Sequence, residues 1–208
     1  MPKNTFLNLP DAKKEYIIEK SIDLFIKYKY EDINIRLIVK ELGISIGSFY
    51  QYFDDKDDLY LYLFVKVEKK VLDMEKKKKG TLLSNDSYIP IEEVLTEREI
   101  KFDNTWYDIP IDVMRKFYFG SYADELFGSA FDEFLSYFDQ GKLNPNLDVD
   151  FIYFIYTTIM FNILIYFRNN NITDIEEKLR IKKSFYGTIL LKGILNSSEE
   201  IPELNITY

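Results

Sequence analysis

The side chains available for chemistry in this 208-residue sequence are limited, because it contains neither histidine nor cysteine. Without these residues a zinc site and a Ser-His or Cys-His nucleophile system are excluded, so carboxylates, lysine, tyrosine and hydroxyl groups remain. The lack of cysteine also excludes disulfides and favours a reducing, cytoplasmic environment. We therefore expect a protein that binds other molecules rather than an enzyme, with no metal and no cofactor.

The polar side chains with the most distinctive spacing lie within residues 34–56. Ser48, Gln51 and Tyr52 are uncharged hydrogen-bonding residues at helical spacing, so they share one face of a short helix. Side chains of this kind recognise base edges in the grooves of DNA. We interpret this stretch as a DNA-reading element.

Two short helices joined by a glycine turn are predicted to hold these side chains. Asn34 is a good N-cap for the first helix, and Gly43 stands where that helix needs a residue that tolerates a positive φ. Ser45 can cap the second helix, whose apolar members Phe49 and Phe53 lie four residues apart. This pattern matches the helix-turn-helix motif, whose second helix enters the major groove. Ordinary helical hairpins share the same spacing.

A longer helix is predicted to follow the hairpin. Asp55 serves as its N-cap and Asp58 lies three residues on, where the positive end of the helix dipole favours both carboxylates. The run Lys76–Lys79, followed by Gly80, would end it. This lysine run could instead be a second DNA contact or a patch that binds anionic lipid.

The net charge of -8 is divided unevenly along the chain. Residues 1–80 hold 16 Lys or Arg and 14 Asp or Glu, a net +2, whereas residues 81–208 hold 11 and 21, a net -10. The small basic excess lies with the predicted helix-turn-helix, so we expect few phosphate contacts and a shallow salt dependence. The basic side chains available for these contacts are Arg36, Lys56, Lys27, Lys29 and Lys40.

Residues 13–60 resemble the TetR (tetracycline-repressor-like) family of transcriptional regulators. The most specific part is the run Gly-Ile-Ser-Ile-Gly-Ser-Phe-Tyr-Gln-Tyr-Phe-Asp-Asp-Lys at residues 43–56. Lys29 departs from the family, which usually has glycine there, so either Lys29 adopts a left-handed conformation or the preceding helix ends differently. Other matching residues are Ile17, Ile18, Leu24, Phe25, Tyr30, Ile35, Arg36, Ile38, Leu42 and Leu59.

The resemblance implies a domain organisation and roles for single residues. It implies a three-helix helix-turn-helix domain at residues 1–54, a connecting helix at 55–80, and a helical effector-binding and dimerisation domain at 81–208. Gln51 could pair with adenine and Ile46 could touch a thymine methyl group, which predicts an A·T-containing half-site. By resemblance, the groove-facing residues are Ser45, Ile46, Gly47, Ser48, Gln51 and Tyr52, and the phosphate-holding residues are Arg36, Tyr50 and Lys56.

The rest of the chain shows helical periodicity without strand-like alternation, which predicts an all-α fold. Residues 81–90 are polar and unperiodic, and form the expected linker. In the resembled family the last two long helices of each subunit form a four-helix dimer interface, which implies a homodimer through residues 149–170 and 174–196. The predicted helices cover residues 91–102, 111–119, 122–140, 149–170 and 174–196.

Residues 151–167 contain no charged side chain and raise an alternative function. A membrane span needs about 20 apolar residues, whereas this run is shorter and contains Thr157, Thr158 and Asn162. A helix that is apolar all round is also typical of a buried helix in a bundle, which is the interpretation we favour, with no membrane partner. The alternative is a helical membrane-associated protein that uses residues 151–167 and the lysine run.

Aromatic residues are concentrated in the middle of the chain, with 19 of the 35 within residues 102–167. Most are expected to form core, but in the resembled family these helices line an effector cavity. Nearby Asp103, Asp108 and Asp124 would suit a flat or cationic hydrophobic molecule through stacking and cation–π contact. The candidate ligand-binding residues are Trp106, Tyr107, Phe117, Tyr118, Phe131, Phe134, Tyr153 and Tyr156.

Together these features imply a ligand-responsive regulator, most simply a repressor, that binds a palindromic operator in double-stranded DNA. By resemblance, a small hydrophobic or aromatic effector would release it from that operator.

Overall fold

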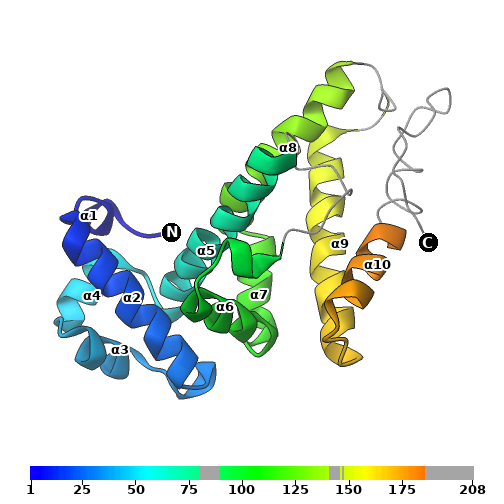
Figure 1. The fold of residues 1–208 in the computed structure, drawn as a ribbon. Helices are drawn as coiled ribbons and strands as arrows, with labels where there is room; N and C mark the ends of the chain where they lie inside the picture. Colours follow the sequence, from blue (N-terminus) through cyan, green and yellow to red (C-terminus); the bar gives the residue numbers. More distant parts are fainter. Residues whose placement is uncertain (80–89, 141–145, 147, 186–208) are drawn as a thin grey trace. The chain divides into compact units, whose positions relative to one another are not determined.

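The computed structural model describes residues 1–79, 90–140, 146 and 148–185, and the regular secondary structure in these ranges is helical throughout (Figure 1). The predicted all-α class is confirmed. The chain divides into two compact units, one formed by Met1–Met74 and Pro90–Leu126 and the other by Glu75–Ile89 and Phe127–Tyr208. The functional boundaries expected at residues 54 and 80 stay predictions.

The first unit begins with a one-turn helix that the sequence pattern did not predict, α1 (Asn4–Leu7), followed by α2 (Asp11–Lys27). Lys29 lies in extended backbone with φ -63° before the short helix η1 (Tyr30–Asp32), so the second of the two alternatives for this position holds. The buried residues of α2 form one stripe that faces the core: Ile17, Ile18, Ser21, Ile22, Leu24 and Phe25.

The predicted helical hairpin is present as α3 (Ile35–Leu42) and α4 (Ile46–Tyr52). The Asn34 side chain accepts a hydrogen bond from the Leu37 N–H at 3.0 Å, which caps α3. Gly43 has φ +63°, the left-handed conformation that favours glycine, and it ends α3. Phe49 and Phe53 are both buried, so the spacing predicted their orientation correctly.

Helix α5 (Lys56–Lys79) supplies much of the core of the first unit. Asp55 accepts a hydrogen bond from the Asp58 N–H at 2.7 Å, which confirms Asp55 as the N-cap. Aromatic rings pack closely against its inner face, since Trp106 stacks on Phe64 with ring centroids 3.9 Å apart. The first half of α5 is buried on most sides, and its buried apolar residues are Leu59, Tyr60, Leu61, Leu63, Phe64, Val65 and Val67.

The segment after residue 90 begins with η2 (Ile91–Glu93) and α6 (Glu97–Asn104), where a single helix over 91–102 was predicted. The break has a local cause, because Thr96 and Glu99 form a capping box that starts α6 afresh. Glu99 also pairs with Lys70 of α5 at 2.5 Å. The unit continues through η3 (Thr105–Tyr107), α7 (Ile111–Tyr118) and the first residues of α8 (Ser121–Asp139).

The described helices of the second unit are the remainder of α8, α9 (Val149–Asn169) and α10 (Ile175–Phe185). The part of the last predicted helix after residue 185 lies outside the described residues. Residues Asp150–Asn169 are long and apolar enough to cross a membrane, although core helices of soluble proteins meet the same criterion. In its most apolar window of 18 residues 28% is buried, so much of this helix is exposed in a single chain.

Candidate nucleic-acid interface

One face of α4 is exposed and carries no charge. Ile46 and Tyr50 are 48% and 49% exposed, and Gly47 and Gln51 are exposed beside them. Their positions i, i+1, i+4 and i+5 place them on one side of the helix, opposite buried Phe49. The helix therefore presents hydrogen-bonding and apolar groups outward, as direct readout of base edges requires.

Gly47 is a residue of this face that the fold itself does not require. A Cβ atom at this position would meet only the Ser45 Oγ, at 3.7 Å, which is ordinary van der Waals contact. Glycine within a helix is less stable than alanine by roughly 0.5–1 kcal/mol. The missing side chain therefore needs another explanation, and close approach of a second molecule to the α4 backbone provides one.

The hydroxyl groups of the first turn hold the helix start in place. Ser45 Oγ accepts a hydrogen bond from the Ser48 N–H at 3.0 Å and lies 2.9 Å from the Ser48 hydroxyl. Ser45 is thus the N-cap of α4, and the Ser48 hydroxyl lies against it. Ser45 is exposed and Ser48 is half-buried, so a contact to DNA would be made from this capped position.

Arg36 lies on the first turn of α3, exposed to solvent. Within the described part of the chain no ion pair to its guanidinium is found, so its five donors can bind an outside anion. This placement agrees with the predicted phosphate contact, which stays a prediction.

Two predicted DNA-binding residues are turned into the protein instead. Tyr52 is only 5% exposed, and its ring packs 5.8 Å from that of Phe6, so it does not face a groove. Lys56 Nζ donates to the carbonyl oxygens of Tyr30 and Ile33 at 2.6 and 2.8 Å. Burial lowers the pKa of Lys56, in keeping with this inward position. We therefore remove Tyr52 and Lys56 from the interface; sequence spacing alone could not show which helix face neighbouring elements cover.

The predicted ligand-binding aromatics divide between the two compact units. Trp106, Phe117 and Tyr118 are buried in the first unit, where Trp106 and Phe117 pack edge to face at 5.3 Å, and burial raises the pKa of half-buried Tyr107 to about 12. The three buried residues therefore belong to the core of the first unit. Phe131, Tyr153 and Tyr156 belong to the second unit, where Phe131 and Tyr153 lie 4.6 Å apart. The Phe134 side chain lies outside the described residues.

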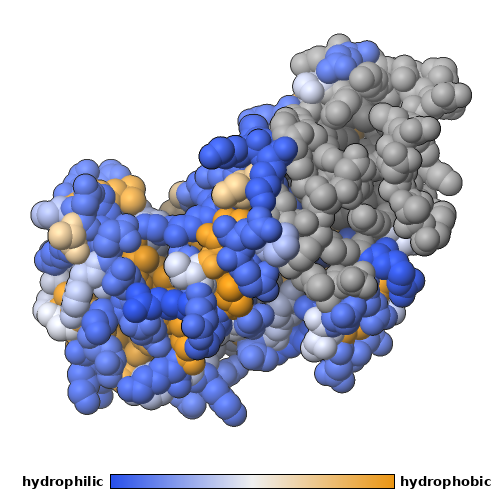
Figure 2. All heavy atoms as spheres, viewed as in Figure 1, coloured by the Kyte–Doolittle hydropathy of each residue, from blue (hydrophilic) through white to orange (hydrophobic). Residues whose placement is uncertain are grey.

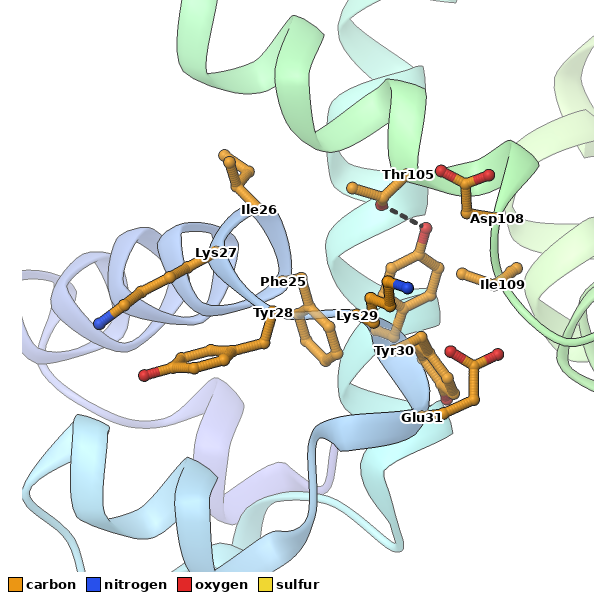
Figure 3. A pocket seen from close by; sticks show the side chains of 11 residues that line it. Phe25, Ile26, Lys27, Tyr28, Lys29, Tyr30, Glu31, Thr105, Asp108 and Ile109 are labelled. Atoms are coloured by element: carbon orange, nitrogen blue, oxygen red, sulfur yellow. Dashed lines mark hydrogen bonds between the residues drawn. The ribbon is translucent and has the colours of Figure 1, made fainter.

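A half-open pocket of about 490 Å³ lies in the first unit, and none of the eight predicted aromatics lines it (Figure 3). Its walls come from residues 25–31, at the end of α2 and in η1, and from Tyr60, Thr105, Asp108 and Ile109. Phe25, Tyr30 and Tyr60 are almost completely covered, so a molecule there would meet a mixture of charged and apolar groups from the other lining residues. Among the described residues no cluster of acidic side chains is arranged to hold a metal ion.

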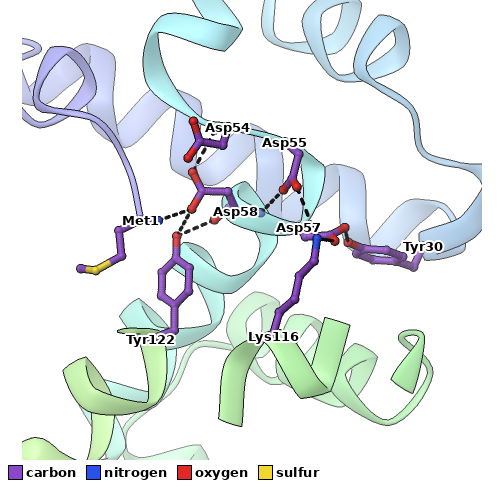
Figure 4. A network of polar contacts seen from close by, with 8 residues as sticks. All are labelled: Met1, Tyr30, Asp54, Asp55, Asp57, Asp58, Lys116 and Tyr122. Carbon is purple, nitrogen blue, oxygen red and sulfur yellow. Dashed lines mark hydrogen bonds and ion pairs between the residues drawn. The ribbon is translucent and has the colours of Figure 1, made fainter. Parts of the chain in front are cut away.

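A polar network that the sequence did not predict surrounds the start of α5 (Figure 4). Lys116 of α7 pairs with Asp57 and lies 3.4 Å from Asp55. Tyr122 of α8 donates to the Asp58 carboxylate, and burial together with this bond raises the pKa of Tyr122. These contacts join α7 and α8 to the residues that directly follow α4. Their partners are about 60 residues apart in the sequence, and no local pattern reveals such pairs.

On the face seen in Figure 2, hydrophilic residues cover most of the described surface, with smaller hydrophobic areas among them.

Comparison with known proteins identifies a family match for the part of the chain that contains the hairpin. Residues 17–63 match the family described as bacterial regulatory proteins, tetR family. The uncharacterized HTH-type transcriptional regulator YwcC of Bacillus subtilis (strain 168) is 35% identical over 74 residues, which cover 35% of this chain and 33% of that protein. The chain thus matches about a third of the length of this relative.

One solved structure shares the fold over most of its length, and a second matches with a lower score. The fatty acid degradation regulator FadR from Bacillus halodurans is 13% identical and superposes with a TM-score of 0.53, covering 88% of this chain and 97% of that chain. A TetR family transcriptional regulator from Chloroflexus aurantiacus J-10-FL is 23% identical with a TM-score of 0.40, covering 94% and 99%.

The hairpin of α3 and α4, with its exposed outer face, is the motif of helix-turn-helix DNA-binding proteins. Residues 17–63 match the tetR family of bacterial regulatory proteins, so this part of the chain is a TetR-type helix-turn-helix domain. Proteins with this domain are DNA-binding transcriptional regulators. The membrane-associated alternative is not favoured by these findings.

Proposed function

We propose that the protein is a ligand-responsive repressor that binds a palindromic operator as a homodimer and reads it with α4. The observation that carries this proposal is the uncharged, exposed outer face of α4, with a glycine that the fold does not require. A short helix that leaves two large side chains half-exposed has a surface suited to a partner.

Each exposed residue has a role that suits its chemistry. Gln51 pairs with adenine through its amide, and Ile46 touches a thymine methyl group. Gly47 lets the α4 backbone approach the groove. Arg36 and Tyr50 hold phosphates and thereby set the register of the helix on the duplex.

A second copy of the chain binds the other half-site of the palindrome. Two recognition helices must lie about 34–36 Å apart to enter successive major grooves. Phe151, Phe154 and Tyr166 of α9 are large hydrophobic residues that this chain leaves exposed, and they support α9 as part of the dimer interface. The expected partner helix continues beyond α10 into residues outside the described ranges.

The network at the start of α5 suggests how an effector acts on DNA binding. A small hydrophobic or aromatic ligand that shifts α7 or α8 changes the position of Lys116 or Tyr122, and their aspartate partners begin at Asp55, three residues after the end of α4. The effector weakens DNA binding by its differential affinity for the two arrangements.

Selection of DNA from random pools with the purified chain tests the proposal. The expected result is enrichment of a palindrome with A·T base pairs in each half-site. A pool without enrichment at moderate salt would overturn DNA reading by α4. An effector that binds tightly without changing operator affinity would overturn its regulatory role. Purification without detergent and failure to bind lipid vesicles would support the cytoplasmic location.

A further inference from the structure

Two carbonyl groups near the C-terminal end of the recognition helix α4 are satisfied from outside the helix. The helix is 7 residues long and leads into Phe53, which has extended backbone with φ -135°. The Phe49 carbonyl accepts from the Phe53 N–H at 2.9 Å. Carbonyl groups in the last turn of a helix that have no partner within it need donors from elsewhere. For the carbonyl groups of Tyr50 and Tyr52 those donors come from the N-terminal segment of the chain.

Lys3 supplies both donors. Its backbone N–H donates to the Tyr52 carbonyl at 2.8 Å, and its Nζ donates to the Tyr50 carbonyl at 2.8 Å. The same ammonium lies 2.8 Å from the Asp54 carboxylate just after the helix. A positive charge is favoured at this end because the helix dipole is negative there. One residue thus caps the end of α4.

Phe6 fixes Lys3 in this position. It lies one turn along α1 and is completely buried. Its ring centroid lies 4.7 Å from that of Phe53, 5.8 Å from that of Tyr52 and 5.5 Å from that of Tyr62. The Phe6 N–H also donates to the Lys3 carbonyl at 2.9 Å. The buried ring therefore anchors the short segment whose first residue caps α4.

We propose that residues 3–6 form a clamp that positions the recognition helix, with Lys3 and Phe6 as positioning residues for DNA binding. This inference rests on the proposed reading of DNA by α4 and deepens it. The clamp lies outside residues 17–63, the part that matches the tetR family. The clamp contacts the C-terminal end of α4, whereas the exposed first turn lies at the other end. It therefore affects DNA affinity only through the position of the helix.

The mechanism follows from the length of α4. A helix this short is not stable by itself, and its formation depends on its surroundings. Only the fully formed helix presents Gln51 correctly, so the apparent affinity falls with the fraction that is formed. The clamp keeps that fraction near one.

The test compares Lys3→Met with Lys3→Arg in the full chain, using the DNA selected from random pools. Lys3→Met removes the side-chain donor, and operator affinity should fall more than twofold and up to about tenfold, the limit set by loss of one charge-assisted hydrogen bond. Amide exchange at Phe53 should become faster. Lys3→Arg keeps a cationic donor and should restore both properties. Lys101→Met removes an equal charge from the surface of α6 and should leave both unchanged.

A direct phosphate contact by Lys3 makes a different prediction. It would lower affinity equally for all DNA sequences and reduce the salt slope of binding by about one. Phe6→Leu separates the two ideas because it changes no charge, and the clamp predicts weaker operator binding with an unchanged salt slope. The proposal is overturned if Lys3→Met binds the operator within about twofold of the unmodified chain, or if the phosphate pattern is found. If the unmodified chain selects no DNA, the proposed function fails, while amide exchange in α4 still reports on the clamp.

Discussion

Replacement of Gly47 by alanine should change fold stability and DNA affinity in opposite directions. The added Cβ meets only Ser45 Oγ at 3.7 Å, so the folded chain accommodates it without movement. Removing a helical glycine should stabilise the fold by about 0.5–1 kcal/mol. For a chain of this size that corresponds to a rise in melting temperature of about 2–4 °C at most.

The same methyl group projects from the face that we assign to DNA. If the α4 backbone lies close to the groove, the Cβ occupies space that a base pair or a sugar needs. Operator affinity should then fall at least about tenfold, which is about 1.4 kcal/mol. A more stable protein that binds DNA more weakly would separate a functional role of Gly47 from a structural one.

Gly128 in α8 offers a matched control. A Cβ there would have no heavy atom within 4 Å, so Gly128→Ala should give a similar stabilisation. It lies outside the DNA-reading hairpin and should leave operator affinity unchanged. Thermal unfolding and fluorescence anisotropy with labelled operator measure the two effects. Unchanged operator affinity in Gly47→Ala would refute the close approach of DNA at this position, and lower fold stability would refute our account of the space around it.

Three further substitutions test the account of the first unit. Ser21→Ala should leave stability unchanged or raise it by up to about 1 kcal/mol in urea unfolding, because the Ser21 hydroxyl is buried without a partner among the described residues; a clear loss of stability would reveal a hydrogen bond. Lys56→Met should lower the free energy of unfolding by roughly 1–3 kcal/mol, since it removes the donors to two carbonyl groups, and an unchanged value would mean that solvent satisfies those groups equally well. Glu99→Gln keeps the capping geometry but loses the charge. Burial alone would raise the pKa of Glu99, but hydrogen bonds from Lys70 and Thr96 outweigh it and lower that pKa below the ordinary 4.5. The stability that this carboxylate contributes is therefore present above pH 4.5 and is lost as the pH falls through the folded pKa, so the difference between the two proteins in unfolding free energy should shrink below about pH 4.5. A difference that stays constant from pH 7 to pH 3 would contradict this assignment.

Local sequence signals predicted the reading hairpin well. Asn34, Gly43 and Ser45 have cap and turn preferences that act within three or four residues, and each lies where its preference places it. The buried positions of Phe49 and Phe53 followed from helical spacing in the same way. Lys29 left two alternatives open, because a helix end depends on what the following residues pack against.

The properties that sequence could not provide depend on distant residues. Tyr52 belongs to the exposed face by spacing, yet α1 covers it with Phe6. Lys56 was predicted to hold a phosphate, but its ammonium donates to the carbonyl groups of Tyr30 in η1 and of Ile33 just after it. The break before α6 is an exception, because Thr96 and Glu99 have the spacing of a capping box and this local signal was present in the sequence. Trp106 was predicted to line a ligand cavity but is part of the core, because aromatic content alone does not distinguish a core residue from a cavity wall.

The central claim is that the exposed face of α4 reads base sequence, and Gln51→Ala tests it most directly. Base preferences of the unmodified and variant chains would be measured on every single-base-pair substitution of the selected operator. We predict that the variant loses preference at one A·T pair in each half-site, a discrimination of about 1–3 kcal/mol, and keeps it elsewhere. A variant whose affinity falls equally for every sequence, or whose preferences match those of the unmodified chain at all positions, would contradict base reading by this face.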